Sequence, residues 1–107
     1  DMDFGRKDSE FVPFFGVPAA TIVAPARMAK MLGMVVQPVV AEMREDGGWR
    51  VVFHEPWQGW PSDDALADTA QMNRWIEAEV RRHPAQYLWV HKRFKTRPRG
   101  EPSLYAR

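Results

Sequence analysis

The sequence predicts an α/β domain, part of a mixed sheet flanked by helices, and two patterns carry this prediction. A strand, helix, strand order occupies the first forty residues, and this order fits a right-handed parallel crossover. An antiparallel hairpin and a long amphipathic helix follow it. The chain has 107 residues, of which 45% are apolar, with five Trp and six Phe. This length corresponds to one domain, and the composition argues against disorder.

Two short apolar runs are the predicted strands of the crossover. Residues 11–15 form the first, and Pro13 within it indicates a strand edge or end. Residues 16–18 then turn the chain into a helix. Residues 35–40 are apolar apart from Gln37, as expected of a strand that is covered on both faces. We therefore expect the two runs to lie parallel in one sheet.

The helix between these strands is indicated by Met28, Met31 and Leu32, which have the spacing of one helical face, and Gly33 ends it. Pro25 either lies close to the start of this helix or kinks it. The methionines are expected to fill the core. The alternative is a flexible surface that faces lipid.

A hairpin is predicted over residues 41–55, because turn-forming residues 45–48 separate two strand-like segments. On its second strand Trp49, Val51 and Phe53 share one face, and Arg50, Val52 and His54 share the other. The loop that follows carries two tryptophans, Trp57 and Trp60. They either sit at a membrane interface or fold back to cap the core.

The second helix is expected to begin at Ser62, which is a favourable N-cap, and to stop at Pro84. Asp63 and Asp64 suit the positive end of its dipole. One stripe is predicted to face the core and consists of Ala65, Leu66, Thr69, Met72, Ile76 and Val80, while Asp68, Gln71, Arg74 and Arg81 point away. Every signal in this helix is structural.

The charge is unevenly distributed although the net charge is only +1. Eight basic residues, Arg81, Arg82, Lys92, Arg93, Lys95, Arg97, Arg99 and Arg107, stand against Glu101 alone from position 81 onward. Residues 87–103 combine five of these cations with aromatic side chains, a composition that suits an anionic partner. Phosphorylated lipid, acidic protein and nucleic acid all fit this pattern.

The residues alone do not point to a catalytic centre. Without cysteine the chain has no disulfide or thiolate metal site, and it has no apolar stretch near 18 residues. No nucleophile elbow, phosphate loop or metal-binding pair of histidines is present. Asp1 and Asp3 could form an acid/base pair or bind a metal, or could belong to a solvated loop. His91 could donate to an anion, although a packing role is favoured.

Three blocks resemble the bacterial lipid A biosynthesis acyltransferases of the lauroyl and myristoyl transferase type. The first is DMDFG followed by FVPFFGVPAAT, at residues 1–5 and 11–21. The second is VVQPVV at residues 35–40, and the third is QYLWVHKRFKTRPRGEPSLY at residues 86–105. The third is the most specific, because so long a match of Trp, His, Arg, Lys and Pro in order is hard to obtain by chance.

This resemblance implies the C-terminal half of a glycerolipid-acyltransferase-like fold. It also implies an enzyme at the cytoplasmic face of the inner membrane of a Gram-negative bacterium. Such enzymes pass an acyl group from acyl carrier protein to a hydroxyl of the phosphorylated lipid A precursor, without a metal or cofactor. A histidine followed five residues later by Asp or Glu is their general base, but His54, His83 and His91 are followed at that distance by Gly59, Leu88 and Thr96. We therefore expect residues 1–107 to be the C-terminal portion of one acyltransferase domain, inactive alone, with the base and membrane anchor upstream.

The resemblance also assigns candidate site residues. Asp1 matches an aspartate that the family uses for activity, and Asp3 lies in the same motif, so both are expected to have supporting roles. Arg93, Lys95 and Arg97 are expected to pair with phosphate of the acceptor or with acidic acyl carrier protein. The alternative for these cations is a solvated face or an anchor to anionic lipid at the membrane surface. The rival functions are a nucleic-acid-binding module, which the resemblance disfavours, and a non-catalytic interaction domain.

Overall fold

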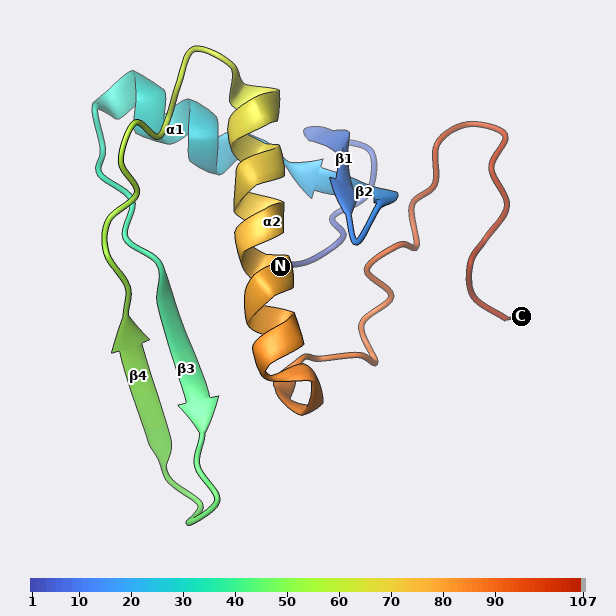
Figure 1. Ribbon diagram of the computed structural model, residues 1–107. Coiled ribbons are helices and arrows are strands. Elements are labelled where there is room, and N and C mark those ends of the chain that lie inside the picture. The colour runs from blue at the N-terminus through green and yellow to red at the C-terminus, as the bar shows by residue number, and fades with distance from the viewer. Residues whose placement is uncertain (107) are drawn as a thin grey trace.

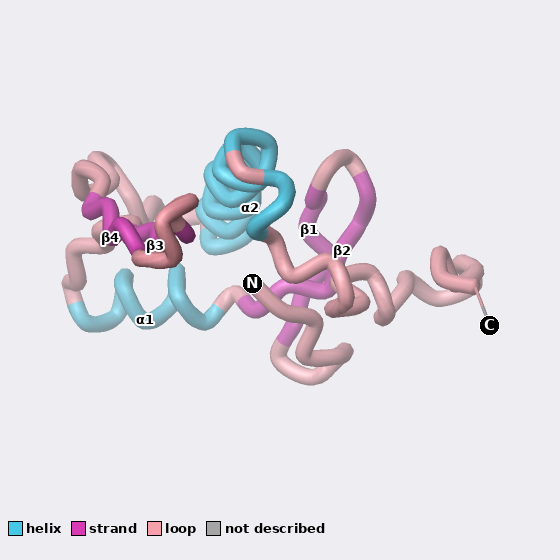
Figure 2. Tube along the Cα trace, turned by 90° about the horizontal axis from the view of Figure 1, so that it is seen from below, coloured by secondary structure: helices cyan, strands magenta, loops and turns pink. Residues whose placement is uncertain are grey.

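The computed structural model describes residues 1–106 and confirms the α/β class. Helix α2 (Ala65–Arg82) lies in the middle of the molecule (Figure 1). Strands β1 (Ser9–Phe14) and β2 (Val17–Ile22) lie on one side of it, and β3 (Val39–Met43) and β4 (Trp49–Phe53) on the other (Figure 2). Helix α1 (Ala24–Leu32) connects the two sides, and a short 3-10 turn, η1 (Pro84–Gln86), follows α2. No helix within residues 1–106 combines the length and apolar character needed to cross a membrane.

The predicted parallel crossover is wrong, since each sheet is a two-stranded antiparallel hairpin. Residues 16–18 do not lead into a helix but into β2, which pairs with β1 from Phe14 opposite Val17. The connection has positive φ at both Phe15 (51°) and Gly16 (74°), which is the backbone of the tight turn that suits strand twist. The strand partner of residues 11–15 is therefore the segment that directly follows the turn, β2, and not residues 35–40.

Helix α2 supports this turn. The backbone N–H of Phe15 donates to Oε1 of Glu77 at 2.7 Å, and the Arg81 guanidinium lies 4.7 Å from the centre of the Phe15 ring. A bulky residue with positive φ is strained unless its surroundings hold it there. The two side chains of α2 thus fix the β1–β2 hairpin against the helix.

The second hairpin is confirmed, and β3 pairs with β4 from Val39 opposite Phe53 to Met43 opposite Trp49. The strand predicted at residues 35–40 begins only at Val39, and the idea that it is covered on both faces is wrong. Val35 is 77% exposed, and the apolar face of β4, with Trp49 and Phe53, is also exposed.

Helix α1 ends as predicted, because Gly33 adopts the left-handed conformation (φ 62°) and its N–H bonds the Ala29 carbonyl. Pro25 lies in the first turn, so the helix begins there and is not kinked. Small side chains of α1 form its buried face, whereas Met28 and Met31 are exposed. The expectation that the methionines fill the core is therefore wrong.

The loop that carries Trp57 and Trp60 folds back onto the core. Of the two alternatives, a membrane interface and a cap on the core, the structure has the second. Trp60 is 5% exposed and packs against Ala26 and Ala29 of α1, with Trp57 beside it. Its indole N–H donates to the backbone carbonyl of Asp68 at 3.0 Å. The buried indole thus joins α1 to the first turn of α2.

The start of α2 differs from the prediction by two residues. Asp64, not Ser62, is the N-cap, and its carboxylate accepts the N–H of Ala67 at 3.0 Å. Ser62 instead donates its hydroxyl to Asp68 at 2.8 Å. Asp68, which was predicted to point away, is buried because its carboxylate accepts both this hydroxyl and the Ser62 N–H. The helix stops before Pro84 as expected.

Candidate functional site

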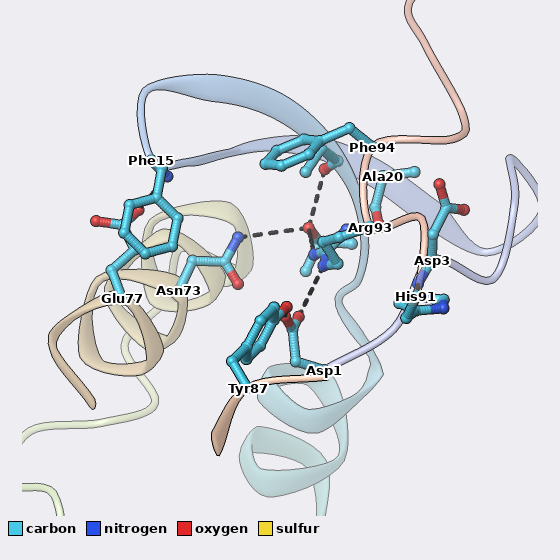
Figure 3. Close-up of polar contacts among 12 residues, drawn as sticks. Asp1, Asp3, Phe15, Ala20, Asn73, Glu77, Tyr87, His91, Arg93 and Phe94 are labelled. Atoms are coloured by element: carbon cyan, nitrogen blue, oxygen red, sulfur yellow. Dashed lines mark hydrogen bonds and ion pairs between the residues drawn. The ribbon is translucent and has the colours of Figure 1, made fainter. Parts of the chain in front are cut away.

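The N-terminal loop and residues of the C-terminal segment meet at the Asp1 carboxylate (Figure 3). Arg93 Nε donates to Asp1 Oδ1 at 2.8 Å, and the Tyr87 hydroxyl donates to Asp1 Oδ2 at 2.5 Å. The Asp1 side chain is 11% exposed and that of Arg93 is 3% exposed. Each carboxylate oxygen therefore has its own donor, and the charge has a cationic partner.

Arg93 uses the rest of its guanidinium to hold strand β2. Nη1 donates to the Ala20 carbonyl and Nη2 to Oγ1 of Thr21, each at 2.9 Å. The guanidinium also lies over the ring of Phe14, 5.3 Å from its centre. Burial lowers the pKa of Arg93, an effect opposed by nearby groups that include Asp3. The predicted phosphate contact at Arg93 does not fit this interior position.

A buried amide on α2 extends the network. Asn73 is completely buried, and its Nδ2 donates to the Pro13 carbonyl at 3.2 Å and to Thr21 Oγ1 at 3.4 Å. Thr21 in turn donates its hydroxyl to the Ala19 carbonyl at 2.9 Å. The β1–β2 hairpin, α2 and the C-terminal segment thus share one hydrogen-bond network around Arg93.

Asp3 is held by a different set of donors. The N–H and the hydroxyl of Thr96 donate to its carboxylate at 2.7 and 3.0 Å, and the Gly5 N–H does so at 2.8 Å. Burial tends to raise the pKa of Asp3, but these hydrogen bonds and the Arg93 charge outweigh it, so the pKa lies below its ordinary value. Asp1 and Asp3 therefore have separate partners and do not form a shared-proton pair.

His91 completes the attachment of the N-terminal loop. Its Nε2 accepts the backbone N–H of Asp3 at 3.0 Å, so a neutral imidazole carries its proton on Nδ1. This contact fits the favoured packing role.

The other two predicted phosphate contacts differ from each other. Arg97 donates Nη1 to the Pro18 carbonyl at 2.7 Å and forms an ion pair with Glu101, and its side chain is 9% exposed. Lys95 is exposed, and within residues 1–106 its ammonium group makes no hydrogen bond or ion pair. Of the three cations, Lys95 alone is available to an outside anion in this structure.

An apolar groove of about 250 Å³ is lined by Asp1 together with residues of the N-terminal loop, β2, α1 and α2. Its lining residues are Asp1, Met2, Phe4, Thr21, Ile22, Pro25, Met72 and Ile76. A larger groove of about 650 Å³ lies between the β3–β4 turn and the end of α2, but its lining is mostly charged and does not include Asp1. The smaller groove therefore has Asp1 itself in its lining.

The sequence indicated Asp1, Asp3 and Arg93 as candidates, but not that Tyr87 binds Asp1 or that Thr96 binds Asp3. Tyr87 belongs to the aromatic run, yet nothing in its spacing indicates that its hydroxyl meets Asp1. Within residues 1–106, no three His, Asp or Glu side chains are grouped as a metal site would require.

Comparison with known proteins places the chain in a family. Residues 1–96 match the family described as bacterial lipid A biosynthesis acyltransferase. The chain is 43% identical to the lipid A biosynthesis palmitoleoyltransferase of Escherichia coli K12 and 41% identical to its lauroyltransferase, covering 98% of this chain and 35% of each relative. The myristoyltransferase of the same organism is 35% identical over all of this chain and 33% of its own length.

The chain thus spans about a third of the length of these curated relatives. The family match covers both segments that meet at Asp1, from the N-terminal loop to Thr96. The chain belongs to the bacterial lipid A biosynthesis acyltransferase family.

Proposed function

We propose that the complete protein transfers a fatty acyl group from acyl carrier protein to a hydroxyl of the phosphorylated lipid A precursor. The acyl thioester bond breaks, an ester forms, and the hydroxyl proton goes to the carrier thiolate. The observation that carries this proposal is the meeting of the two most family-specific blocks at one anchored carboxylate, Asp1. In this proposal the chain is the C-terminal portion of one acyltransferase domain with a glycerolipid-acyltransferase-like fold.

The chain does not supply the general base in this proposal. Acyl transfer to a hydroxyl requires a base that removes its proton. None of His54, His83 and His91 has Asp or Glu five residues later, and His91 uses Nε2 to accept a backbone N–H. We therefore assign the base to a histidine elsewhere in the complete protein, and expect residues 1–107 alone to be inactive.

Asp1 and Asp3 have supporting roles in the proposed reaction. Asp1 lines the apolar groove and has a carboxylate that Arg93 holds in place, and in this proposal it orients the acceptor or the base. Asp3 anchors the loop that carries Asp1, because its carboxylate binds Thr96. The groove has the apolar lining that a fatty acyl chain requires.

In this proposal, basic side chains of the C-terminal segment bind the phosphorylated acceptor, acyl carrier protein and the membrane surface. Lys95 is the proposed contact to phosphate of the acceptor. Arg97, two positions further along the chain, adds positive charge nearby while it donates to the Pro18 carbonyl. The basic C-terminal segment also suits acidic acyl carrier protein and the anionic cytoplasmic surface of the inner membrane.

The test is acyl transfer by the purified complete protein in detergent. Acyl carrier protein loaded with one fatty acid and a phosphorylated lipid A precursor are the substrates, and the product is identified by mass spectrometry. We expect the precursor to gain one acyl group, and Asp1→Asn to reduce the rate at least tenfold. Absence of transfer by the wild-type protein with any of several acyl lengths contradicts the proposed function.

A further inference from the structure

The Asp1 carboxylate is held in a single orientation by two donors that come from the same C-terminal segment. Arg93 Nε reaches Oδ1 at 2.8 Å and the Tyr87 hydroxyl reaches Oδ2 at 2.5 Å. Rotation of the carboxylate about its side-chain bonds breaks at least one of these hydrogen bonds. Figure 3 shows both donors directed at Asp1.

The two donors are themselves fixed. Arg93 is 2% exposed, and its other nitrogen atoms bind Ala20 and Thr21 of β2. Tyr87 packs its ring edge-on against Trp89 with 4.9 Å between the ring centres, and lies 6.4 Å from Phe14. Side chains locked in this way hold a functional group more precisely than a mobile surface contact does.

The protonation state of Tyr87 favours its role as a donor. Burial raises the pKa of the Tyr87 hydroxyl above its ordinary value, although the Arg93 charge opposes this shift. The hydroxyl therefore stays protonated throughout the neutral range. It supplies a hydrogen bond to a carboxylate, which is of the strong, charge-assisted kind.

We propose that Tyr87 and Arg93 are positioning residues for acyl transfer, which fix the carboxylate of Asp1, a residue that lines the apolar groove. This inference rests on the proposed function, and it assigns to Arg93 an internal role in place of a contact to substrate phosphate. Removing the residues that orient metal ligands typically costs about 10- to 100-fold in activity, and we expect a loss at the lower end of this range for the orienting partners of Asp1.

Tyr87→Phe in the complete protein is the sharpest test, because it removes one hydroxyl and keeps the ring. Tyr105→Phe is the matched control, since its hydroxyl accepts the Phe94 N–H at 2.9 Å and does not contact Asp1. We expect Tyr87→Phe to lower kcat by about 10-fold with little change in KM for either substrate. Tyr105→Phe is expected to change kcat less than twofold.

A double-mutant cycle separates positioning from a general structural role. In the Asp1→Asn background we expect Tyr87→Phe to cause no further loss, because the carboxylate on which it acts is absent. Arg93→Lys keeps the charge but replaces the planar three-nitrogen guanidinium by one ammonium nitrogen, which cannot reproduce the separate contacts to Asp1, Ala20 and Thr21. We expect it to lower kcat at least as much as Tyr87→Phe. Should that variant not fold, the Tyr87 cycle still decides the question.

The outcomes distinguish the two proposals. An active wild-type protein in which Tyr87→Phe behaves like Tyr105→Phe, or in which its effect is the same with and without the Asp1 carboxylate, overturns the positioning role alone. A wild-type protein that transfers no acyl group overturns the proposed function and this inference with it. A loss of kcat that vanishes in the Asp1→Asn background supports both.

Discussion

Asp3 and Thr96 are 93 positions apart in the sequence and are joined by two hydrogen bonds, one from the Thr96 N–H at 2.7 Å and one from its hydroxyl at 3.0 Å. The Asp1–Arg93 ion pair lies beside them and has the same long separation, 92 positions. Contacts between such distant segments order a long stretch of chain at once. The N-terminal loop and the C-terminal segment therefore form one structural unit.

Asp3 should make stability depend on pH at the acid end. Its pKa is lowered on folding below the ordinary value of 3.8, so its carboxylate stabilises the folded state above that pH. The stabilisation is lost as the pH falls through the lower, folded-state pKa. We expect Asp3→Asn to destabilise the complete protein by about 1–2 kcal/mol near pH 6. The difference in stability between this variant and wild type should become smaller below about pH 4.

Thermal unfolding midpoints at several pH values between 6 and 3 check this prediction. Glu10→Gln is the control, because Glu10 is an exposed carboxylate on β1. A gap between Asp3→Asn and wild type that is the same at every pH contradicts the charged state of Asp3 as its cause.

Trp60 should contribute more to stability than the equally large Trp49. Trp60→Phe leaves space against Ala26 and Ala29 and removes the hydrogen bond to the Asp68 carbonyl. We expect a loss of about 1–3 kcal/mol in the free energy of unfolding. Trp49 is 63% exposed, so Trp49→Phe should cost less than about 0.5 kcal/mol. Chemical denaturation of the two variants in parallel decides the matter, and equal losses contradict the structural difference.

The elements that the sequence predicted well depend on local signals. Gly33 ends α1 because a left-handed residue is needed there, and residues 45–48 connect β3 to β4 because turn-forming residues are concentrated there. Pairing of residues 11–15 was missed because its turn has a phenylalanine with positive φ. That conformation depends on Glu77, which lies 62 positions away, and no local pattern reports such a contact.

The candidate site was predictable only in part for a similar reason. A run of five cations indicates an anionic partner, but its composition cannot show which cation is buried. Arg93 can be buried because Asp1 neutralises its charge and a carbonyl of β2 accepts one of its hydrogen bonds. Lys95, by contrast, is exposed. The partner of a buried charge comes from tertiary structure, which linear spacing does not contain.

Glu77 offers a direct test of the support that α2 gives to the β1–β2 turn. Glu77→Ala removes the acceptor of the Phe15 N–H and the ion pair with Arg81 at 3.7 Å. We expect a loss of about 1.5–3 kcal/mol, as for hydrogen bonds to charged groups. Arg74→Ala, at an exposed position of the same helix, should stay within about 0.5 kcal/mol of wild type.

Hydrogen exchange of the Phe15 amide adds a local readout for Glu77→Ala. The amide should exchange faster in that variant than in Arg74→Ala, because its acceptor is gone. Unchanged protection of this amide contradicts the assigned contact.

The positive charge of Lys95 should strengthen binding of the phosphorylated acceptor. Its ammonium group is free among residues 1–106, and an exposed ion pair with phosphate is worth about 0.2–1 kcal/mol. We therefore expect Lys95→Ala to raise KM for the phosphorylated precursor by up to about fivefold with kcat unchanged. Lys92→Ala is the matched control, since Lys92 lies three positions away with its ammonium 5.7 Å from the centre of the Tyr105 ring.

Two further measurements show whether the Lys95 effect comes from phosphate. The rise in KM should shrink at high salt, because exposed charges are screened, and it should disappear with an acceptor from which the phosphates have been removed. An effect that is equally large with the dephosphorylated acceptor contradicts a phosphate contact and places Lys95 against another part of the substrate. Equal effects of Lys95→Ala and Lys92→Ala instead indicate a general attraction between the basic segment and anionic surfaces, because such attraction depends on the summed charge and not on one position.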